Sequence, residues 1–435
     1  MAQLLYPSST AGAAQGHFGR SQLLPPLLRY VCVGRNGATV RAGAAMDSAS
    51  VGLLPSGAVI DVAEAVDVGA TRRLRFARSG DGALGAGWVS AKLFVYDGQS
   101  GHANPFRAAA DAAAAPRKAR AARAAAPFAF VAPTGSGSAL LFPGQGAQKV
   151  GMLAPYRDVP GVAAMFAEAS EIFGVDLLDV VENGPAETLN DTRYSQAAVF
   201  LTSLAAAMKL QLDDPSAIAR ATVTAGFSLG EYTALVFAGV ADVRTALRLL
   251  KVRANAMGAA CDAAPSGMMT VLGLDDAQLE AMLPAGVSIA NQLFPKGRVL
   301  SGAESGLAAV ADAVRACGVA GAKATVLAVS GAFHSPYMAP AAAALEAALA
   351  EATFSAPSRT VYSNASGKPH SEDPAEIKAA MVRQLTAGVL WEDTIRDMGA
   401  AFPGVERFYE PAPGRQLGSM MRRIAPANKE KMRSV

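Results

Sequence analysis

The chain has 435 residues, of which 51% are hydrophobic, so it is long enough for two or three domains with a sizeable core. This composition excludes a chain that is disordered throughout. The 39 basic and 36 acidic residues leave a net charge of +3, which gives no reason to expect a nucleic-acid partner. Three scattered cysteines without a C-x-x-C pair argue against a disulfide framework and a structural zinc site. The charge-free stretches are broken by Pro and Gly, so no membrane span is expected.

The first 27 residues are rich in Ser, Ala and Gly, and no acidic residue occurs before Asp47. This composition resembles the end of an organelle transit peptide, and an ordinary disordered N-terminus is the alternative. On this pattern we expect a plastid location, with a mitochondrion or the cytosol as alternatives.

Short strand patterns separated by turn signals fill residues 28–97. Apolar residues alternate with period two at 58–62, and Asn36-Gly37 is typical of a hairpin turn. The stretch resembles a bacterial-type SH3 β-barrel, with Gly-Trp-Val-Ser (87–90) in the usual late position. Trp88 is then either a core residue or part of a ligand groove, and the barrel implies an additional, unknown partner.

Residues 98–138 are alanine-rich and carry a basic run at 117–123, which favours a solvated linker over a contact for an acidic partner. From residue 139 to 425, strand and helix patterns alternate, as in a mostly parallel α/β sheet. Within this domain, residues 267–333 read β-α-β-β-α-β and predict a ferredoxin-like insertion. Residues 426–435 are expected to form a tail.

The elements expected in the α/β domain follow in chain order. They are a strand at 138–144, helices at 159–173 and 195–210, a strand-turn-helix at 221–240, the insertion, a helix at 339–351, a strand at 359–364, a helix from 374 and a strand at 407–411.

A G-x-S-x-G pattern spans residues 226–230, between the predicted strand and helix. Its glycines permit a sharp turn, so Ser228 is expected at the top of the sheet with its hydroxyl exposed. The N–H of Leu229 then lies at a helix N-terminus, where it can bind an oxyanion. A purely structural turn is the alternative.

A nucleophilic serine needs a base, and the chain has only four histidines. His17 and His102 fall in the predicted N-terminus and linker, and His370 lies in a polar loop where we expect it to be exposed. His334 directly follows the last strand of the insertion. Elimination therefore favours His334, with a buried structural histidine as the alternative.

Several separated blocks extend this Ser–His pair to a family. The blocks are LFPGQGAQKVGM (141–152), GFSLGEY (226–232), Arg253 with Met257, SGAFHS (330–335), VYSN (361–364), RQL (383–385) and EPAPGRQL (410–417). In this order and spacing, residues 139–425 resemble the malonyl-coenzyme A:acyl-carrier-protein transacylases, the acyltransferases of fatty-acid synthesis.

The resemblance implies an α/β-hydrolase-like acyltransferase fold and transfer of malonyl from malonyl-coenzyme A to the phosphopantetheine thiol of acyl carrier protein. It implies Ser228 as nucleophile and His334 as general base. The backbone N–H groups of Gln145 and Leu229 would form the oxyanion hole, and the backbone carbonyl of Gln384 would orient the imidazole. Acyl exchange of this kind requires no metal and no cofactor.

The resemblance also implies a substrate pocket. Arg253 would bind the malonyl carboxylate through two parallel hydrogen bonds, whereas a surface arginine is the alternative. Met257, one helical turn later, would line the pocket or fill the core. Phe333 before the histidine resembles the form associated with malonyl rather than methylmalonyl units.

Three positions depart from the family pattern. Phe227 stands where a histidine is common, Leu293 where an asparagine is usual, and Arg298 where a glutamine is common. These changes leave the polarity of the pocket open, and they leave the nucleophile, base and carboxylate clamp intact.

Three functions compete at this stage. The first is malonyl transfer, and the second is a Ser–His thioester hydrolase or an acyltransferase of a polyketide-type pathway. The third is a scaffold with an inert α/β domain. Arg253 and the Gly-Gln-Gly-Ala-Gln loop favour transfer, since a simple esterase needs neither, and the intact Ser228 and His334 argue against a scaffold.

Overall fold

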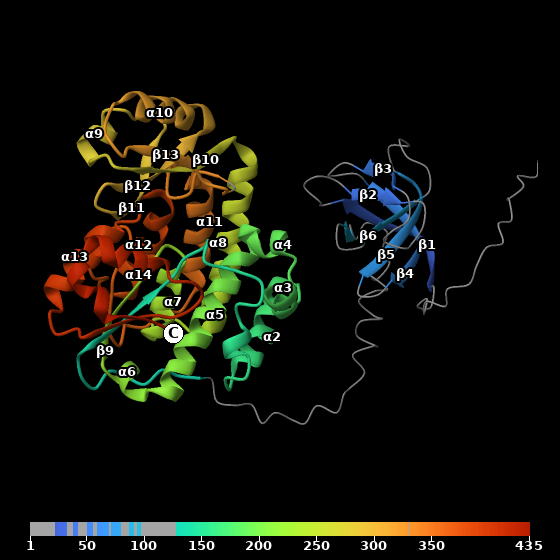
Figure 1. Ribbon diagram of the computed structural model, residues 1–435. Helices are drawn as coiled ribbons and strands as arrows, with labels where there is room; N and C mark the ends of the chain where they lie inside the picture. The colour runs from blue at the N-terminus through green and yellow to red at the C-terminus, as the bar shows by residue number, and fades with distance from the viewer. Residues whose placement is uncertain are drawn as a thin grey trace, which may run out of the picture. The chain divides into compact units, whose positions relative to one another are not determined.

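The computed structural model describes residues 128–329 and 331–435, together with the backbone of seven strands in the preceding part of the chain (Figure 1). The chain divides into two compact units, residues 1–124 and 125–435. The predicted N-terminus before Gln22 and the linker up to residue 127 lie outside the described residues, and so do His17 and His102.

The first unit contains a seven-stranded antiparallel sheet in the order β3-β2-β6-β5-β4-β1-β7. Its strands are β1 (Gln22–Cys32), β2 (Ala38–Arg41), β3 (Ser50–Leu54), β4 (Val59–Val68), β5 (Thr71–Ser79), β6 (Gly87–Ser90) and β7 (Phe94–Tyr96). Strand β1 begins inside the segment 1–27 that was expected to be a disordered or transit-like N-terminus, and its first residues pair with β4. Trp88 lies in β6, and its side chain is outside what is described.

A five-stranded parallel sheet lies at the centre of the second unit, which confirms the predicted α/β fold. The sheet has the order β14-β9-β8-β15-β16. Its strands are β8 (Ser138–Phe142), β9 (Ala221–Gly226), β14 (Thr360–Val361), β15 (Arg407–Glu410) and β16 (Met432–Ser434). Every residue of β8 is buried, as expected for the middle of a parallel sheet covered on both faces.

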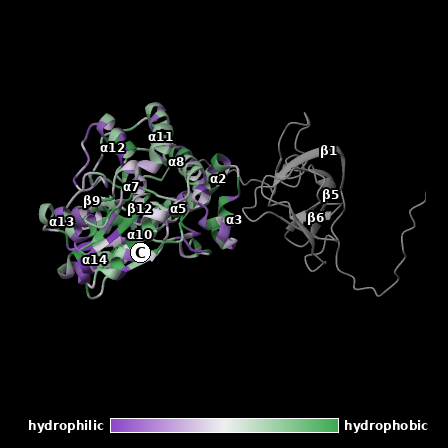
Figure 2. Cartoon of the chain, turned by 90° about the horizontal axis from the view of Figure 1, so that it is seen from above, coloured by the Kyte–Doolittle hydropathy of each residue, from purple (hydrophilic) through white to green (hydrophobic). Residues whose placement is uncertain are grey.

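Alternate residues of β8 contribute to two hydrophobic cores, one on each face of the sheet. Leu140 and Phe142 pack with three long helices, and Ala139 and Leu141 pack with two others. The first group is α5 (Thr192–Asp213), α8 (Val243–Ala263) and α11 (Ala339–Glu351), and the second is α13 (Trp391–Ala401) and α14 (Gln416–Ile424). Figure 2 shows hydrophilic residues gathered on peripheral helices such as α13 and α14.

The remaining helices connect these layers, and the predicted helices at 159–173, 195–210, 339–351 and from 374 correspond to α2, α5, α11 and α12. The connecting helices are α2 (Val162–Phe173), α3 (Leu177–Asn183), α4 (Ala186–Asn190), α6 (Pro215–Ala219), α7 (Gly230–Phe237) and α12 (Pro374–Thr386), with the 3-10 turns η2 (Ala154–Tyr156), η3 (Pro336–Met338) and η4 (Pro426–Lys431).

The insertion has the element order that the sequence predicts, and its antiparallel sheet runs β11-β12-β10-β13. In chain order it comprises β10 (Ser266–Leu272), α9 (Asp276–Glu280), β11 (Ser288–Phe294), β12 (Gly297–Ala303), α10 (Glu304–Ala316) and β13 (Lys323–Val326). These elements enclose a hydrophobic core of their own. They form the yellow and orange part of the second unit in Figure 1.

Both predicted boundaries of the α/β domain are also wrong. Residues 128–137 were assigned to the linker, but Phe130 packs its ring against Phe237 at 4.9 Å and the Val131 carbonyl accepts a hydrogen bond from Arg359. The predicted tail 426–435 supplies β16, which pairs with β15, because its backbone completes the edge of the parallel sheet. Both segments therefore belong to the α/β domain.

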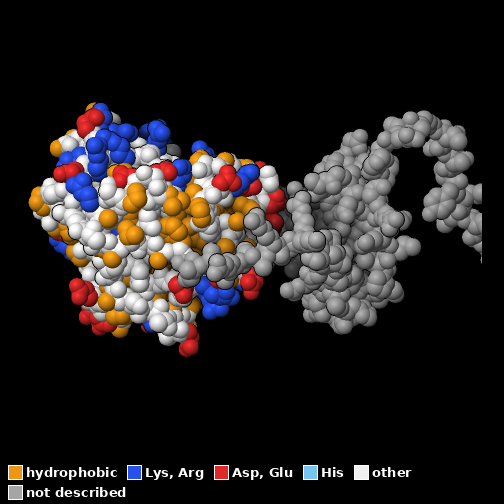
Figure 3. All heavy atoms as spheres, turned by 90° about the horizontal axis from the view of Figure 1, so that it is seen from below, with side chains coloured by type: hydrophobic (Ala, Val, Ile, Leu, Met, Phe, Trp, Pro, Cys, Tyr) orange, Lys and Arg blue, Asp and Glu red, His pale blue; other side chains and the backbone are white. Residues whose placement is uncertain are grey.

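The surface of the second unit is uneven in charge. Figure 3 shows lysine and arginine side chains gathered at one end of the face seen from below. Arg415, Arg422, Lys429 and Arg433 line a cavity of about 350 Å³ together with Glu410. In the part of the chain that is described, no helix is long and apolar enough to cross a membrane.

Candidate active site

Ser228 lies at the turn between β9 and α7, with a left-handed backbone (φ 51°). A side chain at Gly226 would overlap the backbone of Gly230, and one at Gly230 would overlap the backbone of Phe142. Both glycines of the motif are therefore required by close approach. Asn364 fixes the turn, since its Oδ1 accepts from the Ser228 N–H at 2.5 Å and its Nδ2 donates to the Gly226 carbonyl at 2.7 Å.

The Ser228 Oγ and His334 Nε2 atoms are 2.8 Å apart, and His334 Nδ1 lies 2.8 Å from the Gln384 carbonyl oxygen. A carbonyl oxygen only accepts hydrogen bonds, so the proton is on Nδ1 and Nε2 is free to accept from the serine hydroxyl. Burial, and secondarily the charge of Arg253, lower the pKa of His334 to about 4, while the bond to Gln384 acts in the opposite direction. The imidazole is therefore neutral near pH 7.

Arg253 on α8 brings a buried positive charge to the same place, with 1% of the residue exposed. Its Nη1 donates to Gln196 Oε1 at 2.7 Å, and its Nη2 lies 3.2 Å from both Ser228 Oγ and Gln384 Oε1. No carboxylate among the described residues forms a salt bridge with this guanidinium, and its Nε has no hydrogen-bond partner there. Burial lowers the pKa of Arg253, as expected for a cation without an ion pair.

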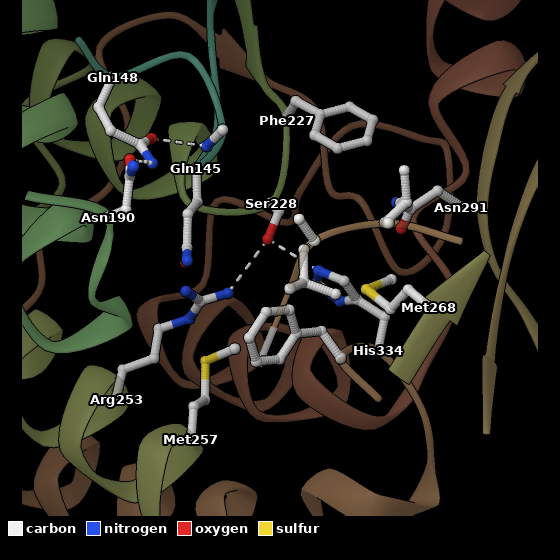
Figure 4. Close-up of a pocket in the computed structure, with 15 residues that line it drawn as sticks. Gln145, Gln148, Asn190, Phe227, Ser228, Arg253, Met257, Met268, Asn291 and His334 are labelled. Atoms are coloured by element: carbon white, nitrogen blue, oxygen red, sulfur yellow. Dashed lines mark hydrogen bonds between the residues drawn. The ribbon is translucent and has the colours of Figure 1, made fainter. Parts of the chain in front are cut away.

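These three side chains line one cavity of about 380 Å³, and Figure 4 shows Ser228 between Arg253 and His334. The other lining residues are Gln145, Gly146, Gln148, Asn190, Phe227, Met257, Met268, Asn291, Leu327, Ala328, Val329 and Phe333. A nucleophile, a neutral base and an unpaired cation thus face a common space, which is an arrangement suited to acyl transfer from a substrate with an anionic end.

Two backbone N–H groups belong to residues next to Ser228 or in the cavity wall. The N–H of Leu229 begins α7, and the N–H of Gln145 follows β8 in the loop that lines the cavity. In the described part of the chain neither N–H donates a hydrogen bond to another residue. Both N–H groups are therefore unpaired in the part of the chain that is described.

Comparison with known proteins identifies the α/β domain. Residues 139–413 match the acyl transferase domain family. The human mitochondrial malonyl-CoA-acyl carrier protein transacylase is 38% identical over 306 residues, which cover 66% of this chain and 77% of that protein. The Escherichia coli K12 malonyl CoA-acyl carrier protein transacylase is 41% identical over 293 residues, 66% of this chain and 92% of that protein. This chain belongs to the malonyl-CoA-acyl carrier protein transacylase family.

Solved structures of this transacylase family share the fold. The Xanthomonas oryzae transacylase is 35% identical with a TM-score of 0.63, covering 69% of this chain and 94% of that one. A malonyl-transacylase in complex with a type II polyketide acyl-carrier protein is 34% identical with a TM-score of 0.62, covering 69% and 95%. The matched region is the α/β domain, as the sequence predicts.

The structure brings together the residues that the transacylase resemblance indicated. Met257, of which 2% is exposed, lines the cavity. Phe333 and Gln145 line the same cavity. Gln196 Nε2 lies 3.6 Å from the Met257 sulfur. Met257 is thus both a core residue and a wall of the cavity, so the two alternatives for it hold together.

The three departures from the transacylase pattern lie in different places. Phe227 lines the cavity and packs edge-on against Trp391, with ring centroids 5.6 Å apart. Leu293 packs on the main hydrophobic core, and Arg298 forms buried salt bridges elsewhere. Neither of these two lines the cavity, so of the three departures only Phe227 lies in its wall.

The expectation that His370 is exposed is also wrong. Its side chain is 2% exposed, and its Nε2 lies 2.6 Å from Oε1 of the fully buried Glu231. The loop before α12 carries polar residues, but His370 folds inward because a buried carboxylate there needs hydrogen-bond donors.

Sequence reasoning missed several polar residues that hold the site, among them Gln196, Glu231 and the side chain of Asn364. All three are buried. Their signal was weak, because a single polar residue in an apolar helix such as α5 gives no indication of its partner. Among the described residues no group of three or more His, Cys, Asp or Glu side chains is placed to hold a metal ion.

Proposed function

We propose that this chain transfers malonyl from malonyl-coenzyme A to the phosphopantetheine thiol of acyl carrier protein, for fatty-acid synthesis. The observation that carries the proposal is the buried Arg253 guanidinium, unpaired with any described carboxylate and 3.2 Å from the hydroxyl of a Ser–His pair. Membership of the transacylase family supports the same reaction.

In the first half-reaction, His334 Nε2 accepts the proton of Ser228 Oγ as the oxygen attacks the thioester carbonyl. The Leu229 and Gln145 N–H groups stabilise the oxyanion of the tetrahedral intermediate. The intermediate then expels the coenzyme A sulfur, which takes the proton from His334. Malonyl is left as an ester on Ser228.

In the second half-reaction, the carrier-protein thiol gives its proton to His334 and attacks the ester, and Ser228 regains a proton as it leaves. The Gln384 carbonyl orients the imidazole in both steps. A neutral carbonyl stabilises an imidazolium less than a carboxylate does, which suits reactive thioester substrates better than amides. The exchange needs no metal or cofactor.

Arg253 selects the acyl group. The two long Nη2 contacts leave hydrogen-bonding capacity for the malonyl carboxylate. A planar guanidinium binds a carboxylate through two parallel bonds, and burial strengthens the attraction because little water screens it. Met257 and Phe333 bound the space around the acyl chain.

The experiment is incubation with malonyl-coenzyme A, with and without acyl carrier protein, followed by mass analysis of peptides and products. We expect a malonyl ester on the Ser228 peptide that disappears when carrier is added, with malonyl appearing on the carrier thiol. Release of free malonate at the same rate in both samples would indicate a hydrolase instead.

We further propose an SH3-like barrel for the first unit and a ferredoxin-like fold for the insertion. The antiparallel order of β1–β7 supports the first, and the β11-β12-β10-β13 order with two helices supports the second. For the compartment we propose an organelle, specifically a plastid. The acid-poor N-terminus supports an organelle, and the human, fly and mouse relatives are named as mitochondrial.

A further inference from the structure

One buried acidic residue beside the site takes no part in the reaction described above. Glu231 lies in the first turn of α7 and is completely buried. Its carboxylate accepts from Gln384 Nε2 at 2.7 Å, from the Asn364 N–H at 3.1 Å and from His370 Nε2 at 2.6 Å. A buried carboxylate with this many donors occupies a single orientation, because any rotation leaves a buried polar group unpaired.

We propose that Glu231 and His370 are positioning residues for malonyl recognition, which fix the side chain of Gln384 and through it the guanidinium of Arg253. The proposal rests on the proposed function of Arg253 as the carboxylate clamp. It assigns a role to Gln384 beyond that of its backbone carbonyl, which orients His334.

The orientation of the Gln384 amide follows from its neighbours. Its Nε2 faces two acceptors, the Glu231 carboxylate and the Ser228 carbonyl at 2.9 Å. Only the NH₂ end of an amide can donate to both, so Oε1 must point the other way, toward Arg253 Nη2 at 3.2 Å. Without Glu231, one of the two reasons for this orientation is lost, and a flipped amide would turn its NH₂ group toward the guanidinium.

Two glutamine oxygens therefore position Arg253, Oε1 of Gln384 and Oε1 of Gln196. Neutral oxygens orient a guanidinium without cancelling its charge. A carboxylate in direct contact would compete with malonyl for the same donors. The Glu231 carboxylate acts through the side chain of Gln384 and does not contact Arg253. It therefore fixes the geometry of Arg253 and leaves the hydrogen-bonding face of Arg253 to the substrate.

His370 completes the arrangement on the far side of Glu231. It lies in the loop between β14 and α12, where its backbone N–H donates to the Val361 carbonyl at 2.7 Å. Its imidazole supplies the donor for Glu231 Oε1, so Oε2 remains directed at Gln384 and Asn364. Removing this donor leaves a buried carboxylate oxygen unpaired, and the carboxylate is then free to rotate.

The test compares kcat/KM for malonyl- and acetyl-coenzyme A in the wild type and a series of variants. Glu231→Ala and His370→Leu remove the positioning hydrogen bonds. Glu231→Gln and His370→Gln keep an acceptor and a donor of similar reach. Glu392→Gln is the matched control, because Glu392 is a buried carboxylate paired with Arg298 and Arg396, neither of which lines the cavity.

We expect Glu231→Ala and His370→Leu to lower the malonyl-to-acetyl ratio by about tenfold or more, mainly through KM for malonyl-coenzyme A. The two glutamine variants should restore most of the ratio. Glu392→Gln should lower the melting temperature and leave the ratio at the wild-type value, since it removes only structural ion pairs, with Arg298 and Arg396.

The proposal is overturned if Glu231→Ala or His370→Leu folds and keeps the wild-type ratio. It is also overturned if either variant lowers kcat/KM for both substrates in parallel, as a structural defect would. Arg253→Ala, measured in the same series, separates this inference from the proposed function. If Arg253→Ala leaves the ratio unchanged, the clamp itself is wrong. If it lowers the ratio and Glu231→Ala does not, only the positioning role is wrong.

Discussion

Ser228 and His334 meet at 2.8 Å, and both have left-handed backbone angles, with φ of 51° and 56°. Lys296 is the only other non-glycine residue of the described part with a positive φ. Such conformations cost about 1–3 kcal/mol each and persist where the surrounding structure enforces them. Two of these three backbone positions therefore carry the side chains that react.

Replacing Ser228 separates its chemical role from its backbone strain. Ser228→Ala should abolish the malonyl ester, because the nucleophile is gone. Ser228→Gly should be equally inactive but more stable than Ser228→Ala by about 1 kcal/mol, since glycine adopts a positive φ without strain. Mass analysis of labelled peptides and thermal unfolding test the two parts. A malonyl label on Cys261, or an active alanine variant, would contradict the mechanism.

His334 predicts the acid limb of the pH profile. Burial, helped by Arg253, lowers its pKa from 6.5 to about 4, so the base stays neutral well below the usual histidine range. The kcat/KM for malonyl transfer should therefore hold down to about pH 5 and fall as the pH approaches 4. Folding stability should weaken between 6.5 and 4, since the unfolded chain takes up a proton that folded His334 does not.

The same pKa provides a control. Arg253→Ala removes the nearby positive charge, so the acid limb measured with acetyl-coenzyme A should move to higher pH in that variant. An acid limb that stays in place would mean that the charge of Arg253 does not lower the pKa of His334.

His334→Ala should reduce transfer by about 10²–10⁴-fold, the usual contribution of a general base.

Arg253→Ala should discriminate between substrates. Loss of one partner of a buried charge pair costs roughly 2–5 kcal/mol, or about 30- to several-thousand-fold in kcat/KM for malonyl-coenzyme A. Acetyl-coenzyme A should lose less, although the 3.2 Å contact of Arg253 with Ser228 Oγ means that its rate also changes. Equal losses for both substrates would show that Arg253 supports the site without binding the malonyl carboxylate.

The start of the α/β domain predicts where a truncation is tolerated. Removal of residues 1–124 should leave transfer unchanged, because all cavity residues lie in the second unit. Removal of 1–133 also deletes Phe128 and Phe130, which pack on the core, and the Val131 carbonyl bound by buried Arg359. We expect a loss of about 2–5 kcal/mol in the free energy of unfolding. Urea unfolding of both fragments measures this difference in the free energy of unfolding. Equal stabilities of the two fragments would refute the prediction.

Local sequence was sufficient for the parts of this protein that local interactions control. The Gly226 and Gly230 spacing predicted the turn at Ser228, because close backbone approach there excludes any side chain. Period and composition predicted the parallel sheet and the β-α-β-β-α-β order of the insertion. The scarcity of histidines favoured His334 without knowledge of its neighbours, although His370 was set aside on the wrong expectation that it is exposed.

Tertiary structure decided what depends on distant partners. The polarity of its loop made His370 look exposed, yet it lies against Glu231, 139 residues away in sequence. The family resemblance associated Arg298 with the pocket, but this side chain forms salt bridges with Asp276 and Glu392 and does not line the cavity. Segments 128–137 and 426–435 have little pattern of their own and are ordered by the core and sheet edge that they complete. A buried polar side chain is placed by the donors and acceptors around it, and only the folded chain brings these together.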